Sequence, residues 1–246
     1  MNKRLEGKVV IVTGATRGMG AAIARGVAAQ GGKVVMGGRS AAAGLAVAEG
    51  LGANAVFAQL DVGNEADWVV IVELALRTFG RIDGLVNCAG LMGKNPLSET
   101  SLELLRELIA TNQIGALLGI KHTVPAMSEA GGGSIVNIGS IAALRGMADI
   151  SAYSGTKAAI YGITRSAAME LASDNIRVNT IHPGVFATQM LEDAMGSEGL
   201  TYGAQVTPMG RVGQPEEMVG PVVFLLGDES SFVTGSTLSV DGGLSL

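Results

Sequence analysis

The sequence lacks the features that mark secreted, nucleic-acid-binding and membrane proteins. Its 246 residues include one cysteine, Cys88, which cannot form an internal disulfide and suits a reducing compartment. Charged residues make up 16%, the net charge is −5, and no lysine and arginine cluster could follow a phosphate backbone, so we expect no nucleic-acid partner. No apolar run reaches the roughly 20 residues of a membrane span, and residues 1–8 lack an apolar signal core. We therefore expect a cytoplasmic protein with no membrane partner.

Apolar residues (48%) and glycines (37) are abundant, while there are only six prolines. Short β-branched runs alternate with longer helix-like stretches along the whole chain. We predict strands at 9–13, 33–36, 55–60, 82–87, 133–138, 176–181 and 237–240, and helices at 18–30, 41–51, 65–79, 101–128, 152–172 and 215–226. The strand segments are apolar throughout, so helices should cover both faces of the sheet. The pattern predicts a single α/β domain over residues 1–246, a doubly wound parallel sheet of the Rossmann type with about seven strands.

One segment, residues 187–211, interrupts this alternation. It mixes glycines and polar residues with apolar side chains that include Met190, Leu191, Met195, Leu200 and Tyr202. It is too long for a simple turn, and insertions of this kind often act as lids over a substrate site.

A glycine-rich turn follows the first predicted strand and opens the first predicted helix. It reads Thr13-Gly14-Ala15-Thr16-Arg17-Gly18-Met19-Gly20. Glycines at positions 14, 18 and 20 allow a sharp turn and a close approach to a pyrophosphate, at which the helix N-terminus points its N–H groups. The alternative is an ordinary glycine-rich turn, but a strand before and a helix after it favour dinucleotide binding.

A candidate catalytic group lies in the second half of the chain. Tyr153 and Lys157 are four residues apart on a predicted helix and share a face. An ammonium near a phenol favours the phenolate and improves it as an acid and base. Ser140 ends a predicted strand, where it could hold a carbonyl oxygen that gains negative charge. Tyr161 and Arg165 repeat the spacing without such a serine, which shows how readily the pair alone arises by chance.

Together these motifs resemble the short-chain dehydrogenase/reductase family across almost the whole chain. The glycine spacing resembles the family's TGxxxGxG, and Asn87-Cys88-Ala89-Gly90 resembles its NNAG, with Cys88 in place of the second asparagine as a tolerated, unreactive residue. The resemblance implies NAD(P)-dependent transfer of a hydride, with Asn112, Ser140, Tyr153 and Lys157 as catalytic residues. Lys157 would also bind the nicotinamide ribose, and Asn112 would bend its helix and hold a water. Cofactor contacts are implied for Gly14, Thr16, Arg17, Gly18, Met19, Gly20, Arg39, Asp61, Val62, Asn87, Ala89, Gly90, Tyr153, Lys157, Pro183, Gly184, Val185 and Thr188.

The choice of cofactor depends on charge after the second predicted strand. An acidic residue there would bind the adenosine ribose and repel a 2′-phosphate, but the segment reads Gly37-Gly38-Arg39-Ser40. Arg39, together with Arg17, could bind that phosphate, although both could instead be ordinary surface arginines. We predict NADP(H), with NAD less favoured. His122 and His182 show no metal-ligand spacing, and we expect no metal.

The predicted substrate wall is mostly apolar. It includes Ile141, Met147 and Ile150, between Ser140 and Tyr153, and Met190 and Leu191 in the lid, so an apolar ketone or secondary alcohol fits better than a charged metabolite. We interpret Arg145 as a solvent-facing exception. Carbonyl reductases, alcohol dehydrogenases and hydroxysteroid dehydrogenases of the family offer the best likeness.

Two alternatives remain open. One is a 3-oxoacyl-carrier-protein reductase, but residues 127–133 lack basic side chains and Met169 stands where an arginine is common. The other is a non-catalytic dinucleotide sensor on the same fold.

The chain also carries signs of self-association. Helices 101–128 and 152–172 have more apolar positions than one buried stripe requires, including Leu117, Leu118, Ile120, Ile160 and Ile163. In the family these helices pair across a two-fold axis, and the C-terminal strand region supports a second axis. We predict a homotetramer, with a dimer as the alternative.

Overall fold

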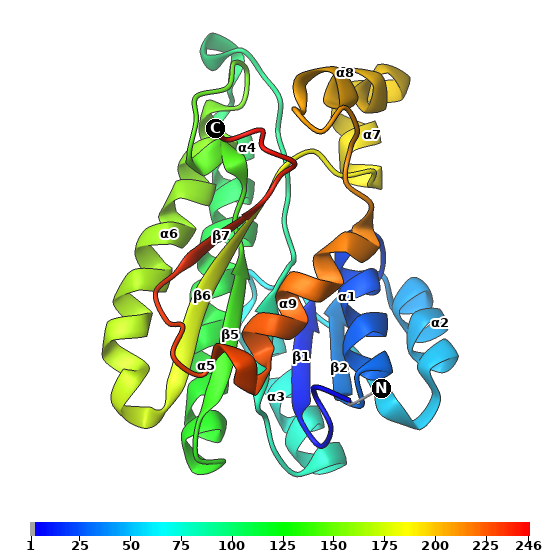
Figure 1. Ribbon diagram of the computed structural model, residues 1–246, viewed down its shortest axis with the longest axis vertical. Coiled ribbons are helices and arrows are strands. Elements are labelled where there is room, and N and C mark those ends of the chain that lie inside the picture. The colour runs from blue at the N-terminus through cyan, green and yellow to red at the C-terminus, as the bar shows by residue number, and fades with distance from the viewer. Residues whose placement is uncertain (1–2) are drawn as a thin grey trace.

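The computed structural model describes residues 3–246 and centres on one parallel sheet (Figure 1). Its strand order is β3-β2-β1-β4-β5-β6-β7, and neighbouring strands pair in parallel, as Val10 does with Val34 and with Gly84. The strands are β1 (Val9–Thr13), β2 (Lys33–Gly38), β3 (Ala55–Gln59), β4 (Gly84–Asn87), β5 (Gly133–Ile138), β6 (Ile176–Pro183) and β7 (Thr237–Val240). The predicted doubly wound parallel sheet is confirmed.

Helices cover both faces of the sheet and enclose two separate cores. One face packs against α1 (Gly18–Ala29), α2 (Ala41–Leu51) and α9 (Val219–Leu226). The other packs against α3 (Glu65–Phe79), α5 (Gly115–Glu129) and α6 (Ser151–Leu171). In β1, Val10 and Val12 enter the first core, while Val9 and Ile11 enter the second. This alternation explains why the strand is apolar at every position.

The predicted helix over 101–128 consists of three pieces. It begins with α4 (Leu102–Leu108), passes through a π-helical turn, η3 (Ile109–Ile114), and continues as α5. Asn112 lies inside the π turn and is buried. A π turn adds one residue to the helical repeat and is frequent at functional sites. The last predicted helix likewise begins as a 3₁₀ turn, η7 (Pro215–Met218), before α9.

Residues 187–211 hold two short helices, α7 (Gln189–Met195) and α8 (Gly199–Val206). Both lie at the top of Figure 1, beyond the carboxyl ends of the strands. The base of the segment is closed by parallel pairing, in which Ala187 N–H donates to the Gly213 carbonyl at 2.9 Å and Gly213 N–H to that of Val185 at 2.9 Å. Among residues 3–246, no helix has the length and apolar character needed to cross a membrane.

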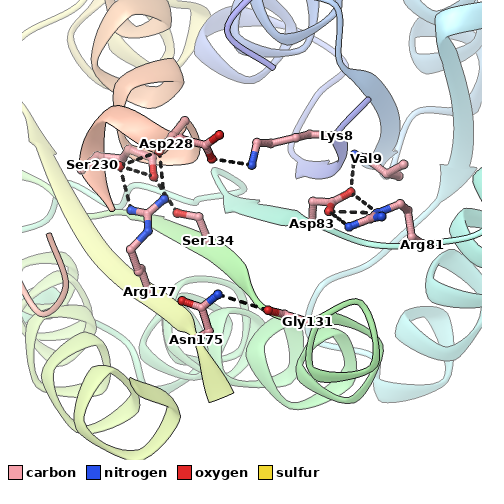
Figure 2. Close-up of polar contacts among 12 residues, drawn as sticks. Lys8, Val9, Arg81, Asp83, Gly131, Ser134, Asn175, Arg177, Asp228 and Ser230 are labelled. Atoms are coloured by element: carbon pink, nitrogen blue, oxygen red, sulfur yellow. Dashed lines mark hydrogen bonds and ion pairs between the residues drawn. The ribbon is translucent and has the colours of Figure 1, made fainter. Parts of the chain in front are cut away.

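The opposite end of the sheet is held by a network of polar contacts (Figure 2). Arg177, at the start of β6, donates from its guanidinium to the Ser230 hydroxyl at 2.7 Å and to the Gly227 carbonyl at 3.1 Å. The Lys8 ammonium lies 2.8 Å from a carboxylate oxygen of Asp228. The Ser134 hydroxyl donates to the Leu225 carbonyl at 2.7 Å. These contacts fix the end of α9 on the sheet.

We expect Arg177→Ala to lower the free energy of unfolding by about 2 kcal/mol, because a half-buried charged donor and its two hydrogen bonds are lost. Denaturant titration would measure this. Arg77→Ala, at an exposed position in the last turn of α3, is the matched control and should change stability by less than about 0.5 kcal/mol. Equal effects of the two substitutions would contradict the role given to the network.

Candidate active site

The glycine-rich turn between β1 and α1 needs glycine at two positions for different reasons. Gly14 has a φ of +66°, and a Cβ atom there would lie 2.8 Å from the Ala89 Cα atom. A Cβ on Gly20 would collide with the Gly14 carbonyl oxygen. In the part of the chain that the structure describes, no side chain caps the first turn of α1. The turn is therefore open to an anion at a helix N-terminus, and it fits a dinucleotide pyrophosphate.

Thr13 joins this turn to the segment after β4. Its hydroxyl oxygen accepts hydrogen bonds from the backbone N–H groups of Cys88 and Ala89, each at 3.0 Å. The carboxyl ends of β1 and β4 are neighbours, and the chain leaves them in opposite directions, which is where ligands bind in open α/β sheets. Our sequence analysis did not give Thr13 a role, because a threonine at a strand end carries no signal of its partner.

Asn87 lies beneath the site. Its amide N–H group donates to the Asn137 side-chain oxygen at 2.8 Å and to the Ala116 carbonyl at 3.3 Å. Asn137 in turn donates to the Thr164 hydroxyl at 2.9 Å, to which the Thr180 hydroxyl donates at 2.7 Å. These four buried side chains link β4, β5 and β6 to α6. The amide nitrogen of Asn87 therefore bonds within the sheet, while the residue also lines the small pocket beside Lys157.

Ser140, Tyr153 and Lys157 come together at the carboxyl end of β5. Tyr153 and Lys157 are buried on one face of α6, with the ammonium 5.9 Å from the centre of the phenol ring. Lys157 donates to the Ile138 carbonyl at 2.8 Å. Ser140 N-caps the 3₁₀ turn η4 (Ile141–Ala143), its hydroxyl accepting from Ala142 N–H at 3.1 Å. The arrangement agrees with the spacing that the sequence predicted.

Burial pushes the ionisable groups of this site toward their neutral forms. It raises the pKa of the Tyr153 phenol, and a hydrogen bond with Ser140 opposes that rise. Burial also lowers the pKa of Lys157 to about 8. The sequence analysis expected Lys157 to lower the tyrosine pKa, whereas the opposing influence in this structure comes from Ser140. Burial raises the pKa of the Cys88 thiol to about 11, which agrees with an unreactive cysteine.

Asn112 uses its whole side-chain amide to join three segments. Its oxygen accepts from Leu91 N–H at 2.8 Å, and its nitrogen donates to the Leu91 carbonyl at 2.8 Å and the Thr156 hydroxyl at 3.0 Å. A small pocket between Asn112 and Lys157 is also lined by Thr13, Val62 and Ala89. Gly90 lies beside both residues. A Cβ atom at this position would be 3.5 Å from the Asn112 side-chain oxygen and 3.6 Å from the Lys157 ammonium nitrogen.

The remaining predicted cofactor residues lie around the same crevice. Thr188 begins α7 and faces the glycine turn, its methyl group 3.6 Å from where a Cβ on Gly18 would lie. Gly184 packs closely on Asp241, where a Cβ would be 2.7 Å from the Cα atom. Val185 faces α8 at Gly203. Apart from two arginines, four predicted cofactor residues remain. Thr16 and Met19 are half-buried and Pro183 is buried. Asp61 is exposed, and its carboxylate accepts a hydrogen bond from Gly63 N–H at 3.0 Å.

The two arginines proposed for a ribose phosphate are both exposed. Arg39 follows β2, and its carbonyl accepts from the Gln59 side chain at 3.2 Å, which leaves the guanidinium outside that contact. The Arg17 guanidinium lies 4.0 Å from an Asp193 carboxylate oxygen in α7. Gly38 packs on Thr16, whose methyl carbon would lie 2.6 Å from an added Cβ.

The predicted substrate wall is only partly brought together. Met147 and Ile150 pack with Tyr153 in one apolar cluster. Ile141 is buried outside that cluster. In segment 187–211, the Met190 methyl group lies 3.9 Å from where a Cβ on Gly90 would be, while Leu191 packs within that segment against Gly199. The cluster also contains Leu91, Met92, Leu104 and Leu108, which no motif in the sequence singled out.

The sequence predicts that Arg145 faces solvent. The residue is exposed, but its guanidinium also makes a hydrogen bond within the protein. Its guanidinium donates to the Leu244 carbonyl at 2.5 Å. The loop between Ser140 and Tyr153 is thereby tied to the end of the chain. The sequence could not show this contact, because the two residues are 99 positions apart.

Together the fold and these residues define a dinucleotide-dependent oxidoreductase. A profile of a protein family described as "Enoyl-(Acyl carrier protein) reductase" matches residues 14–245. The 3-alpha-(or 20-beta)-hydroxysteroid dehydrogenase of Mycobacterium tuberculosis is 40% identical over 99% of this chain and 91% of its own. The NADP-dependent (R)-specific alcohol dehydrogenase of Lentilactobacillus kefiri is 37% identical over 99% of this chain and 98% of its own.

A solved structure shows the same architecture. An Agrobacterium tumefaciens protein, provisionally assigned as a gluconate dehydrogenase, superposes with a TM-score of 0.92 and 31% identity, covering 100% of this chain and 98% of its own. The chain belongs to the short-chain dehydrogenase/reductase family, as its motifs predicted. It is an oxidoreductase of that family.

Proposed function

We propose that this enzyme transfers a hydride between NADP(H) and an apolar ketone or secondary alcohol, with Tyr153 as the acid and base. The proposal rests on one observation: Ser140, Tyr153 and Lys157 lie together at the carboxyl end of β5, beside the glycine turn. A bound nicotinamide supplies or accepts the hydride. The protein supplies the proton and the charge that the carbonyl oxygen requires.

Each side chain has a distinct task in this proposal. Tyr153 donates its proton to the carbonyl oxygen during reduction and removes it from the alcohol during oxidation. Because burial raises its pKa, the phenol keeps its proton at neutral pH and is ready for reduction. The Ser140 hydroxyl stabilises negative charge on the substrate oxygen. Lys157 holds the ribose beside Tyr153. The small pocket next to Lys157 has room for a water, which can donate to the second lone pair of the Asn112 side-chain oxygen.

The cofactor part of the proposal rests on Arg39 and Gly38. Arg39 is exposed after β2, where the chain has no carboxylate to repel a phosphate. Arg17 would have to give up its long contact with Asp193, an exposed pair that costs little to break. The Lentilactobacillus kefiri relative is named as NADP-dependent, which favours NADP(H) here as well.

The substrate class rests on the apolar cluster around Tyr153 and on the two-helix segment 187–211, which we propose to be a lid. The apolar cluster favours a ring-shaped or bulky apolar alcohol. Related dehydrogenases are named for steroids and for cyclohexanol, which supports this choice. Reduction of the 3-oxo group of a carrier-bound 3-oxoacyl thioester is the second candidate, and the description of the matching family favours a carrier-bound substrate. Activity on free ketones but not on carrier-bound 3-oxoacyl groups would separate the two.

The lone cysteine supports a cytoplasmic location.

We also propose a homotetramer, on a set of residues that shares only Leu117 with the set first considered. Ile120 and Ile160 are buried in the protomer, and Leu118 and Ile163 pack on its second core, so they are not surplus. The exposed apolar side chains on these helices are Leu102, Ile114, Leu117, Tyr161 and Met169. Strand β7 is an edge strand with an exposed face that includes Leu238, and it offers a second contact surface.

We expect Tyr153→Phe to abolish turnover while the cofactor still binds, because only the proton donor is removed. Steady-state kinetics and cofactor titration by fluorescence would measure the two effects. Tyr161→Phe is a matched control on the same helix: its hydroxyl accepts from Arg165 at 2.9 Å, and its loss should leave kcat unchanged. Retention of more than a few per cent of activity by Tyr153→Phe would show that another group is the acid.

We expect Arg39→Ala to weaken NADPH about ten- to a hundred-fold and NADH far less, because a charged hydrogen bond is worth roughly 1.5–3 kcal/mol. The ratio of kcat/KM for the two cofactors is the measurement, and Arg25→Ala, exposed on α1, controls for the lost charge. Gly38→Asp is a less direct test, because its side chain would also press on Thr16. Wild-type preference for NADH, or equal losses with both cofactors, would reject NADP(H).

Light scattering should return a particle of about four chains of 24.9 kDa. Leu117→Glu would place a charge in the proposed α4–α5 contact and should reduce the assembly to a smaller one. Glu73→Lys, at an exposed position on α3, is the control for a change of surface charge. A monomer in the wild type would contradict both the tetramer and the dimer.

A further inference from the structure

A buried histidine next to the catalytic serine has no task in the mechanism above. His182 lies in β6 with none of its surface exposed. Its Nδ1 atom is 2.6 Å from the Ser140 carbonyl oxygen and 3.1 Å from the Ser140 backbone nitrogen. Within residues 3–246, its Nε2 atom has no hydrogen-bond partner. Burying a polar ring without satisfying both nitrogens is costly, so the ring needs a compensating role.

The two distances indicate which way the hydrogen bond runs. One ring nitrogen cannot donate and accept at once, and the contact to the carbonyl is the shorter. Nδ1–H therefore donates to the Ser140 carbonyl. Burial lowers the pKa of His182, the contact with Ser140 opposes this, and the nearby Lys157 charge lowers it further. The ring is accordingly neutral at neutral pH and acts through its hydrogen bond, not through charge.

The local chain is shaped to admit the ring. A Cβ atom on Gly139 would lie 2.7 Å from His182 Nδ1 and 2.8 Å from Cε1. Glycine at position 139 thus leaves the space that the imidazole fills. Gly139 N–H donates to the Ile181 carbonyl at 2.7 Å, so the residues just before and at the catalytic serine are both held to β6.

We propose that His182 is a positioning residue for the proposed reaction: its imidazole fixes the Ser140 backbone, and thereby the Ser140 hydroxyl against Tyr153. The inference rests on the proposed function of Ser140 and Tyr153. The hydroxyl is anchored from two sides, since Ala142 N–H donates to its oxygen at 3.1 Å while His182 holds the carbonyl of the same residue. Its proton remains available for Tyr153 or the substrate oxygen.

The test compares two polar replacements. The side-chain nitrogen of asparagine can occupy the position of Nδ1, whereas that of glutamine reaches the position of Nε2. His182→Phe and His182→Gln should lower kcat for a ketone substrate about tenfold with little change in the KM for NADPH, and His182→Asn should restore most of the rate. Arg177→Ala is the control: it removes the hydrogen bonds to Ser230 and Gly227 at the opposite end of the same strand. It should lose stability but keep kcat.

Two further readouts distinguish positioning from a structural effect. Alcohol oxidation by the wild type should rise with pH as Tyr153 loses its proton, and in His182→Phe this rise should move to higher pH, because the Ser140 contact that lowers the tyrosine pKa is weakened. The titratable groups facing this corner are Tyr153 and Lys157 on α6 and Cys88 after β4. In a Ser140→Ala background, His182→Phe should have no additional effect on kcat, because the two residues act as one unit.

The outcomes separate this inference from the proposed function. An inactive Tyr153→Phe enzyme together with unchanged kcat in His182→Phe, or rescue by glutamine and not by asparagine, overturns the role of His182 alone. So does a further loss from His182→Phe in the Ser140→Ala background. An active Tyr153→Phe enzyme overturns the proposed function itself. If His182→Phe does not fold, the asparagine and glutamine variants still decide the question.

Discussion

The site depends on how the ends of β1 and β4 are joined. The Thr13 hydroxyl accepts two backbone N–H groups from the segment after β4, and this contact sets the glycine turn against Ala89. The chain runs from β1 and from β4 toward opposite edges of the sheet. This reversal creates a crevice at the carboxyl ends of the two strands, which is lined by the loops that follow them. The Thr13 contact, together with the pairing of β1 with β4, maintains the close approach of Gly14 to Ala89.

The second half of the site is coupled to the first through buried side chains. Hydrogen bonds run from Asn87 in β4 through Asn137 in β5 to Thr164 in α6. Because α6 also carries Tyr153 and Lys157, this chain of bonds fixes these two side chains relative to the glycine turn. A buried hydrogen-bond network of this kind favours one packing over its near neighbours, since any other leaves polar groups unpaired.

The proposed reacting groups are buried, and burial shifts the pKa of each ionisable group in the direction of its neutral form. Burial raises the pKa of Tyr153 and of Cys88, and it lowers the pKa of Lys157 and of His182. With a pKa of about 8, Lys157 still carries its proton at neutral pH, and the Ile138 carbonyl holds it in place. The site thus keeps one positive charge beside a neutral phenol, an arrangement suited to protonating a carbonyl oxygen.

The sequence by itself determined the parallel sheet, the family and the grouping of Ser140, Tyr153 and Lys157. These follow from short-range patterns: apolar runs with glycine turns at their ends, and a four-residue spacing on one helix. It did not determine which helix faces point inward: Ile120 and Ile160 count as surplus apolar positions in the sequence, yet both are buried in the protomer. It also gave no sign that Asn87 bonds Asn137, that Arg145 holds Leu244, or that His182 lies against Ser140, 42 positions away. Only the tertiary structure decided these, because a polar side chain pairs with whatever group the packing of distant strands and helices brings within hydrogen-bond distance.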